Sequence, residues 1–262
     1  MVSNGQAVVL GVLQGLTEFL PVSSSGHLVL GQHLLGLKEP ELLFDVAVHV
    51  GTLIAVVACF WRELWTMLRG LWARDENGEL GRRLILLVMV GSLPTAAIGL
   101  LFRHDFERLF GSVTAVGVAL IITGVLLMAT HFAPPARREI WRMGVWRALV
   151  IGLVQGVAIT PGISRSGSTI SAALLLGIDR RLAAQYSFLL SLPAIAGALL
   201  LHLKELGPDQ AVEWTPLLAG AGVAAITGLI ALKLLIGVVQ RGGLHWFAFY
   251  CWALGAVSLI WA

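Results

Sequence analysis

Two short polar segments interrupt apolar stretches of the 262-residue chain and carry its chemically capable side chains. The first, PVSSSGH (residues 21–27), follows Glu18 and combines a carboxylate, three hydroxyls and the imidazole of His27, groups suited to acid–base and nucleophilic catalysis. The second, PGISRSGSTI (residues 161–170), carries Arg165 among hydroxyls, and an arginine fork suits phosphate oxygens. A helix restarting at each segment would also direct free N–H groups at an anion. Together these groups indicate phosphoryl transfer.

The rest of the chain is too apolar for a water-soluble protein. Hydrophobic residues make up 57% and charged residues 13%, against about 45–50% and about 25% in globular proteins. Such a chain cannot cover a soluble surface with polar groups, so the bilayer must be its solvent. The formal net charge of +3 comes from basic residues in short loops, which argues against a nucleic-acid partner. Cys59 and Cys251 lie in apolar segments and are expected to be buried thiols.

Hydropathy predicts an all-α polytopic membrane protein of about ten helices. Six nearly uncharged runs could each cross about 30 Å of hydrocarbon. Two further stretches, 6–37 and 147–178, are broken by the polar segments. Irregular backbone at membrane depth persists only where protein or a wet cavity satisfies it, so each stretch is predicted to be a re-entrant hairpin of two short helices. The six full spans are expected at about residues 43–61, 84–102, 113–132, 186–203, 215–239 and 244–262.

An internal repeat relates the two hairpins. Shifting the chain by 141 positions lays residues 11–37 on residues 152–178 without a gap. Each hairpin precedes three spans, an odd number, so the second half must insert upside down, as in an inverted-topology repeat. We therefore predict one membrane domain, 1–262, with halves at about 5–132 and 146–262. The identical pairs are Gly11/Gly152, Gln14/Gln155, Gly15/Gly156, Ser23/Ser164, Ser25/Ser166, Gly26/Gly167, Leu34/Leu175, Leu35/Leu176 and Gly36/Gly177.

Lysine and arginine are divided unequally between the two predicted sides. The loops at 62–83, 133–147, 179–185 and 240–245 hold twelve arginines, whereas the other side holds Lys38, Arg103, Arg108 and Lys204. Because the basic side is cytoplasmic, both termini are expected outside and the first hairpin is expected to enter from the outer face. Tryptophans near span ends, such as Trp61 and Trp246, suit an interfacial belt.

Several residues also have simpler structural interpretations. Any single serine or glycine in the hairpins could serve only the backbone or close helix packing, which is the role expected for the small-residue pairs Gly11/Gly15 and Gly152/Gly156. Glu18 and Arg165 could form a structural ion pair. Asp45 and His49 have metal-ligand spacing on one helix face, but two ligands do not make a site.

The motifs GLTEFLPVSSSGH and PGISRSGSTI resemble those of the bacterial undecaprenyl-diphosphate phosphatase family associated with bacitracin resistance, over essentially the whole chain. The resemblance implies a multi-pass protein of the bacterial inner membrane whose site faces outward. It implies removal of the terminal phosphate from a C55 polyprenyl diphosphate, which regenerates the carrier for peptidoglycan synthesis. It further implies Glu18 as an essential acid, Ser24 as nucleophile, His27 as acid or base, and Arg165 as phosphate clamp.

A further set of hairpin residues is expected to bind substrate. Many family members carry a glutamate where this chain has Gln14, so a site for Mg²⁺ or Ca²⁺ built on two carboxylates is weakened and the metal requirement stays open. Gln14 can still hydrogen bond. The predicted substrate-binding set is Gln14, Ser23, Ser25, Gly26, Ser164, Ser166, Gly167 and Thr169.

Two alternatives remain open from the sequence. The nucleophile is either Ser24, through a phosphoserine, or a water molecule activated by Glu18 or His27. The rival function is a polyprenyl-phosphate flippase, because inverted repeats with broken helices and a midplane site are also the plan of transporters. Membrane lipids and the polyprenyl diphosphate are the expected partners, and the sequence does not set the oligomeric state.

Overall fold

The computed structural model describes residues 2–37, 42–110, 112–134, 143–205 and 213–261. Within these ranges every regular element is a helix. The elements are α1 (Asn4–Phe19), α2 (Ser24–Leu34), α3 (Leu42–Cys59), α4 (Trp61–Arg69), α5 (Glu76–Leu101), α6 (Arg103–Phe110), α7 (Val113–Ala129), η1 (Thr130–Phe132), α8 (Val145–Val157), α9 (Arg165–Leu175), α10 (Arg180–Glu205), α11 (Trp214–Gln240), η3 (Leu244–Trp246) and α12 (Phe247–Trp261).

The prediction of an all-α polytopic membrane protein is confirmed. In the described part of the chain, five helices are long and apolar enough to span a bilayer: Glu76–Leu101, Val113–Phe132, Arg180–Leu201, Trp214–Gln240 and Leu244–Trp261. The sixth expected span corresponds to α3, which passes the same test together with α4. Two helix–loop–helix hairpins, α1–α2 and α8–α9, occupy the stretches that the polar segments break.

Two helices, α4 and α6, were not expected, because their charged residues interrupt the apolar runs on which the span prediction depends. Helix α4 is bent by 72° from α3. Its apolar residues recur at helical spacing, and Trp61, Trp65 and Leu68 are exposed. An exposed apolar face beside charged residues is typical of a helix that lies in the membrane interface.

The first helix of each hairpin packs against a long helix from the other half of the chain. Helix α1 lies along α11, and α8 lies along α5. Glycines permit the close approach: a Cβ on Gly11 would overlap the backbone of Gly220, and one on Gly152 would overlap the carbonyl of Gly91. The packing role expected for these small residues is thus confirmed.

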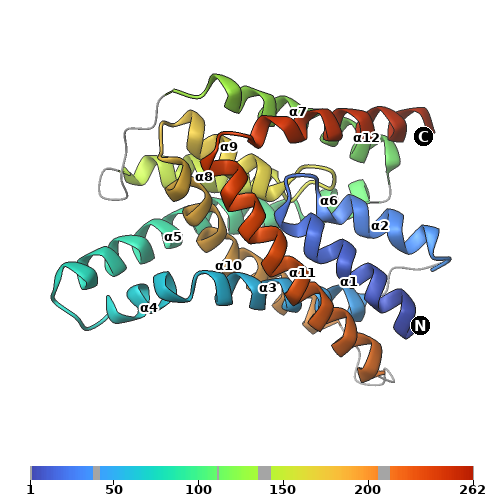
Figure 1. The fold of residues 1–262 in the computed structure, drawn as a ribbon, viewed down its shortest axis with the longest axis horizontal. Helices are drawn as coiled ribbons and strands as arrows, with labels where there is room; N and C mark the ends of the chain where they lie inside the picture. The colour runs from blue at the N-terminus through green and yellow to red at the C-terminus, as the bar shows by residue number, and fades with distance from the viewer. Residues whose placement is uncertain (1, 38–41, 111, 135–142, 206–212, 262) are drawn as a thin grey trace.

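The two ends of the molecule differ (Figure 1). Both chain termini lie at one end, on the right of the view, and the turn between α4 and α5 lies at the opposite end. Helices α7 and α12 pack side by side along one edge. The arrangement matches the expectation that the termini share one side, away from the arginine-rich loop after α3.

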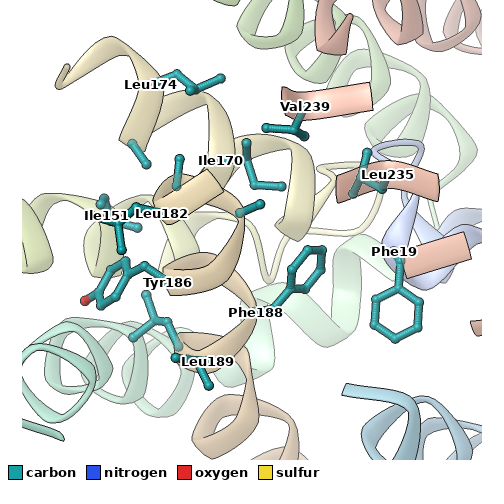
Figure 2. Close-up of a cluster of buried hydrophobic side chains, with 14 of the residues drawn as sticks. Phe19, Ile151, Ile170, Leu174, Leu182, Tyr186, Phe188, Leu189, Leu235 and Val239 are labelled. Carbon is teal, nitrogen blue, oxygen red and sulfur yellow. The ribbon is translucent and has the colours of Figure 1, made fainter. Parts of the chain in front are cut away.

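A buried apolar cluster forms around α10 and fixes the inner end of α1 (Figure 2). Phe19 and Phe188 face each other edge to face, with ring centroids 5.8 Å apart. Gly228 on α11 leaves room for the Phe19 ring, because a Cβ there would overlap it. Since Glu18 directly precedes Phe19, the cluster holds the backbone from which the carboxylate extends.

Candidate active site

The first hairpin loop places a strained, buried serine between two helices. Helix α1 ends at Phe19, and Pro21 cannot continue its hydrogen-bond ladder. Ser23 is almost fully buried and adopts φ +69°, a left-handed conformation that is uncommon for a residue other than glycine. Strain of this kind concentrates at functional sites. Helix α2 then begins at Ser24, so the Ser24 side chain lies at the helix N-terminus.

The second hairpin loop is held by α7. Thr123 on α7 accepts a hydrogen bond from the Ser164 backbone N–H (3.1 Å), and its hydroxyl donates to the Gly162 carbonyl (3.2 Å). Gly162 has φ +91°, and a Cβ there would overlap the Val116 carbonyl. Ser164 caps α9 by accepting from the Gly167 N–H (3.1 Å), so Arg165 is the first residue of that helix.

The two loops meet at Glu18. Arg165 donates from Nη2 to Glu18 Oε1 at 2.7 Å, and Ser24 donates from Oγ to Glu18 Oε2 at 2.6 Å. Gln14, one turn earlier on α1, donates from Nε2 to the same Oε2 at 3.1 Å. The Glu18 side chain is 6% exposed and that of Arg165 18% exposed. The structure therefore joins a carboxylate, a hydroxyl and a guanidinium from sequence positions 147 residues apart.

Close contact between the loops depends on a glycine. A Cβ on Gly167 would overlap the ring of Pro21 in the other hairpin. Under the 141-residue shift, Ser24 and Arg165 are equivalent positions, and each is the first residue of the second helix in its hairpin. The repeat thus brings one nucleophilic and one cationic side chain to the same carboxylate.

Most of the other predicted binding residues form hydrogen bonds within their own hairpins. The hydroxyls of Ser23 and Ser25 lie 3.4 Å apart, and those of Ser164 and Ser166 lie 3.3 Å apart. Thr169 donates to the Arg165 carbonyl at 2.9 Å. Substrate binding by these hydroxyls stays a prediction. Gly26 faces Val116 of α7, where a Cβ would be in van der Waals contact.

His27 lies in the same hairpin, but its ring is directed away from Ser24. Nδ1 contacts the Ser23 carbonyl at 2.8 Å, and Nε2 contacts the Tyr250 hydroxyl of α12 at 2.6 Å. Ser24 is instead hydrogen bonded to Glu18. The sequence left open whether Glu18 or His27 is the base. The geometry favours Glu18 as the base for Ser24.

Sequence reasoning missed two residues at this site. His49 on α3 places Nε2 3.9 Å from Glu18 Oε2, while its Nδ1 donates to the Asp45 carbonyl at 2.7 Å. The sequence signalled His49 only through its spacing from Asp45. Tyr250 had no signal at all, because it lies in an apolar span 223 residues from His27.

Two buried polar atoms at the site have no hydrogen-bond partner in the described part of the chain: Arg165 Nη1 and Gln14 Oε1. A buried guanidinium N–H without a partner is costly, so Nη1 is available to an incoming anion. The free Nη1 is the donor that a phosphate oxygen requires.

The groups that contact Glu18 are hydrogen-bond donors, and the metal requirement stays open. Mg²⁺ and Ca²⁺ require about six or more oxygen ligands, whereas the Glu18 carboxylate is surrounded by the N–H and O–H donors of Arg165, Gln14 and Ser24. Among the described residues, no group of three His, Cys, Asp or Glu side chains is placed to hold a metal ion. The positive charge beside Glu18 comes from the Arg165 guanidinium.

The fold and site define a class: polytopic helical membrane proteins in which two helix–loop–helix hairpins build one buried polar site. Within it, the chain belongs to the family of the bacitracin resistance protein BacA, whose model matches residues 7–257. The chain is 46% identical to an undecaprenyl-diphosphatase of Desulfatibacillum aliphaticivorans and 48% identical to one of Desulforapulum autotrophicum, over 97% of each chain. It is 43% identical to one of Carboxydothermus hydrogenoformans, over 97% of this chain and 96% of that protein. The family resemblance read from the motifs is confirmed.

Proposed function

We propose that the protein hydrolyses undecaprenyl diphosphate to the monophosphate and inorganic phosphate. Family membership over nearly the whole chain supports this activity, as do relatives that carry the name undecaprenyl-diphosphatase. Recycling of the lipid carrier for peptidoglycan synthesis, and resistance to bacitracin, follow from that reaction. From the distribution of the arginines, we infer that the protein lies in the bacterial inner membrane with its site toward the outer face.

The observation that carries the proposal is the bridging of Ser24 and Arg165 by Glu18. A hydroxyl 2.6 Å from a carboxylate is positioned for proton transfer. A guanidinium with one nitrogen on that carboxylate and another unpartnered is positioned to take a phosphate oxygen. Binding an anion alone would not require the carboxylate–hydroxyl pair, so the site favours an enzyme over a flippase.

In the first step, Arg165 and the N-termini of α2 and α9 hold the diphosphate. Ser24 passes its proton to Glu18, and Oγ forms a bond to the terminal phosphorus. The bridging P–O bond breaks, its electron pair stays on the lipid monophosphate, and Glu18 returns the proton to that leaving oxygen. The product of this step is a phosphoserine at Ser24.

In the second step, water attacks the phosphoserine. Glu18, again ionised, accepts the proton of the water, the P–Oγ bond breaks, and Ser24 recovers a proton as phosphate leaves. His27 remains a candidate acid or base for this water. Direct attack by water on the diphosphate is the alternative route, and it would form no covalent intermediate.

Phosphate release from undecaprenyl diphosphate by the purified protein in detergent tests the activity, since transport would require two compartments. We expect steady release by the wild type and at least about 100-fold slower release by Glu18→Gln. No release by a folded wild-type protein would refute the function.

Rapid quenching with substrate labelled on the terminal phosphorus separates the two routes. The covalent route predicts acid-stable label on Ser24 and loss of both label and turnover in Ser24→Ala. Ser92→Ala is the matched control, because the Ser92 hydroxyl donates to the Val88 carbonyl within α5, away from the two hairpin loops. An unlabelled enzyme, combined with substantial turnover by Ser24→Ala, would favour direct attack by water.

A further inference from the structure

Helix α12 supports the first hairpin loop through two adjacent residues. Tyr250 places its hydroxyl 2.6 Å from His27 Nε2. Cys251, the next residue, is buried and donates its thiol to the Pro21 carbonyl at 3.3 Å. One turn of a transmembrane helix therefore contacts the strained loop at Pro21 and the first turn of α2 at His27, on either side of Ser24.

The hydrogen bonds of His27 determine its tautomer. The Ser23 carbonyl can only accept, so Nδ1 must carry the proton in their 2.8 Å contact. In the neutral imidazole, Nε2 is then the acceptor, and the Tyr250 hydroxyl is its donor. The two rings are nearly parallel, with an interplanar angle of 15° and centroids 5.8 Å apart. The Ser23 carbonyl thus selects the tautomer, and the phenol fixes the direction of Nε2.

We propose that Tyr250 is a positioning residue of the active site, which holds Nε2 of the Nδ1–H tautomer of His27 toward α12 and away from Ser24. The inference rests on the proposed function, because it assigns a consequence in turnover. This orientation separates the roles of the two bases in the site. Glu18 accepts the proton of Ser24, and His27 is left for a different proton transfer. The contact with Tyr250 also assigns α12, which carries no motif residue, a part in the chemistry.

Among the described residues, four further titratable or charged groups are joined to this site by hydrogen bonds or ion pairs, and they come from four helices. They are Cys251 on α12, Glu18 on α1, His49 on α3 and Arg165 on α9. Of these, the Cys251 thiol bonds the loop backbone, and the remaining three form the Glu18 cluster. Only a comparison between variants therefore isolates the part of the pH profile that depends on Tyr250.

The chain offers a matched control, because it has only two tyrosines. Tyr186 donates its hydroxyl to the Leu87 carbonyl at 2.8 Å inside the apolar cluster around α10. Tyr250→Phe and Tyr186→Phe each remove one phenolic hydroxyl and one hydrogen bond. We expect Tyr250→Phe to lower kcat about tenfold and to leave KM within about twofold of the wild type. A tenfold loss is at the lower end of what removal of a group that orients a functional histidine costs. Tyr186→Phe should keep kcat within about twofold of the wild type.

A spectroscopic measurement tests the contact independently of turnover. In the Tyr186→Phe background, biosynthetic 3-fluorotyrosine labels Tyr250 alone. We expect its ¹⁹F resonance to shift with pH as His27 changes charge, and this pH dependence to disappear in His27→Gln. The kcat profile of Tyr250→Phe should change shape over the same pH range.

The outcomes separate the inference from the proposed function. Equal kcat values for wild type and Tyr250→Phe across the pH range would overturn the inference, as would an equal loss in Tyr186→Phe. A ¹⁹F resonance that is unaffected by His27→Gln would also overturn it. If the wild type releases no phosphate while the ¹⁹F coupling is present, the proposed function fails and the contact between Tyr250 and His27 stands.

Discussion

Glu18 lowers the cost of burying the Arg165 charge before any substrate binds. An isolated guanidinium buried at membrane depth is expensive, by about 2.5–3.5 kcal/mol on insertion scales. The 2.7 Å contact with Glu18 compensates that charge in the free protein. A bound diphosphate brings negative charge to the unpartnered Nη1 of Arg165 and competes for the rest of the guanidinium. Glu18 then retains its hydrogen bond from the Ser24 hydroxyl.

Arg165→Lys tests whether the planar, multidentate guanidinium of Arg165 is needed. Lysine keeps the charge but offers a point donor, so it cannot bond Glu18 and a phosphate oxygen in the same planar geometry. We expect kcat/KM for phosphate release to fall about 100-fold, which corresponds to about 2.7 kcal/mol.

Arg83→Lys is the control for that substitution, because Arg83 donates to the Met143 carbonyl on another part of the molecule. It should retain most of the wild-type kcat/KM. Near-normal kcat/KM in Arg165→Lys would remove Arg165 from the role of phosphate clamp.

Gln14→Glu tests whether a second carboxylate beside Glu18 makes turnover depend on a divalent cation. The Gln14 amide lies 3.1 Å from Glu18, so the substitution would place two carboxylates in contact and supply the oxygen ligands that hard cations prefer. We expect turnover by the variant to depend more steeply on Mg²⁺ or Ca²⁺ than turnover by the wild type. Titration of phosphate release with each cation after chelation measures the difference, and identical cation dependence in the two proteins would contradict the expectation.

At the scale of helices, small residues decide how closely the hairpins approach their neighbours. Gly15 on α1 faces the backbone of Ala224 and Gly228 on α11, and even an alanine Cβ would overlap both. Glu18 follows Gly15 by three residues on the same helix. A shift of α1 away from α11 would therefore also move the carboxylate.

Gly15→Ala should lower stability by about 1–3 kcal/mol, as overpacking does in other cores. Thermal unfolding in detergent, followed by circular dichroism, measures the loss. Gly222→Ala on α11 is the control, because a Cβ there meets open space; that substitution should leave Tm unchanged or raise it, since alanine is the better helix former. A Gly15→Ala variant as stable as Gly222→Ala would show that the α1–α11 contact tolerates a wider spacing.

The elements that the sequence predicted are those with a strong local signal. Long apolar runs identified the spans, and Pro21 and Gly162 marked the hairpin loops. Charge inside apolar stretches identified Glu18 and Arg165, since such charge is costly without a use. Helix α4 was missed because its charged residues make it too polar for a span. Tyr250 was missed because an aromatic residue in an apolar span carries no local sign of a partner 223 residues away.

At the scale of the whole molecule, the two halves are interlocked. Helix α1 packs on α11, α8 packs on α5, and α7 pairs with α12. Each hairpin is therefore held by the opposite half, and Glu18 meets Arg165 only when both halves are in place. The predicted halves, 5–132 and 146–262, describe the repeat, and the packing makes the whole chain the unit that forms the site.

The proposed orientation can be tested with single cysteines at exposed positions near opposite ends of α5. Asn77 near its start lies beside the arginine-rich turn, and Asp105 lies in α6 just after its end. With Cys59 and Cys251 replaced by alanine, we expect a membrane-impermeant maleimide to label Asp105→Cys in intact cells and Asn77→Cys only after permeabilisation. The positive-inside rule requires that order, because the Asn77 side carries most of the arginines. The reverse pattern would place the termini in the cytoplasm and the first hairpin on the inner side, where the enzyme would meet diphosphate made inside the cell instead of diphosphate released outside it.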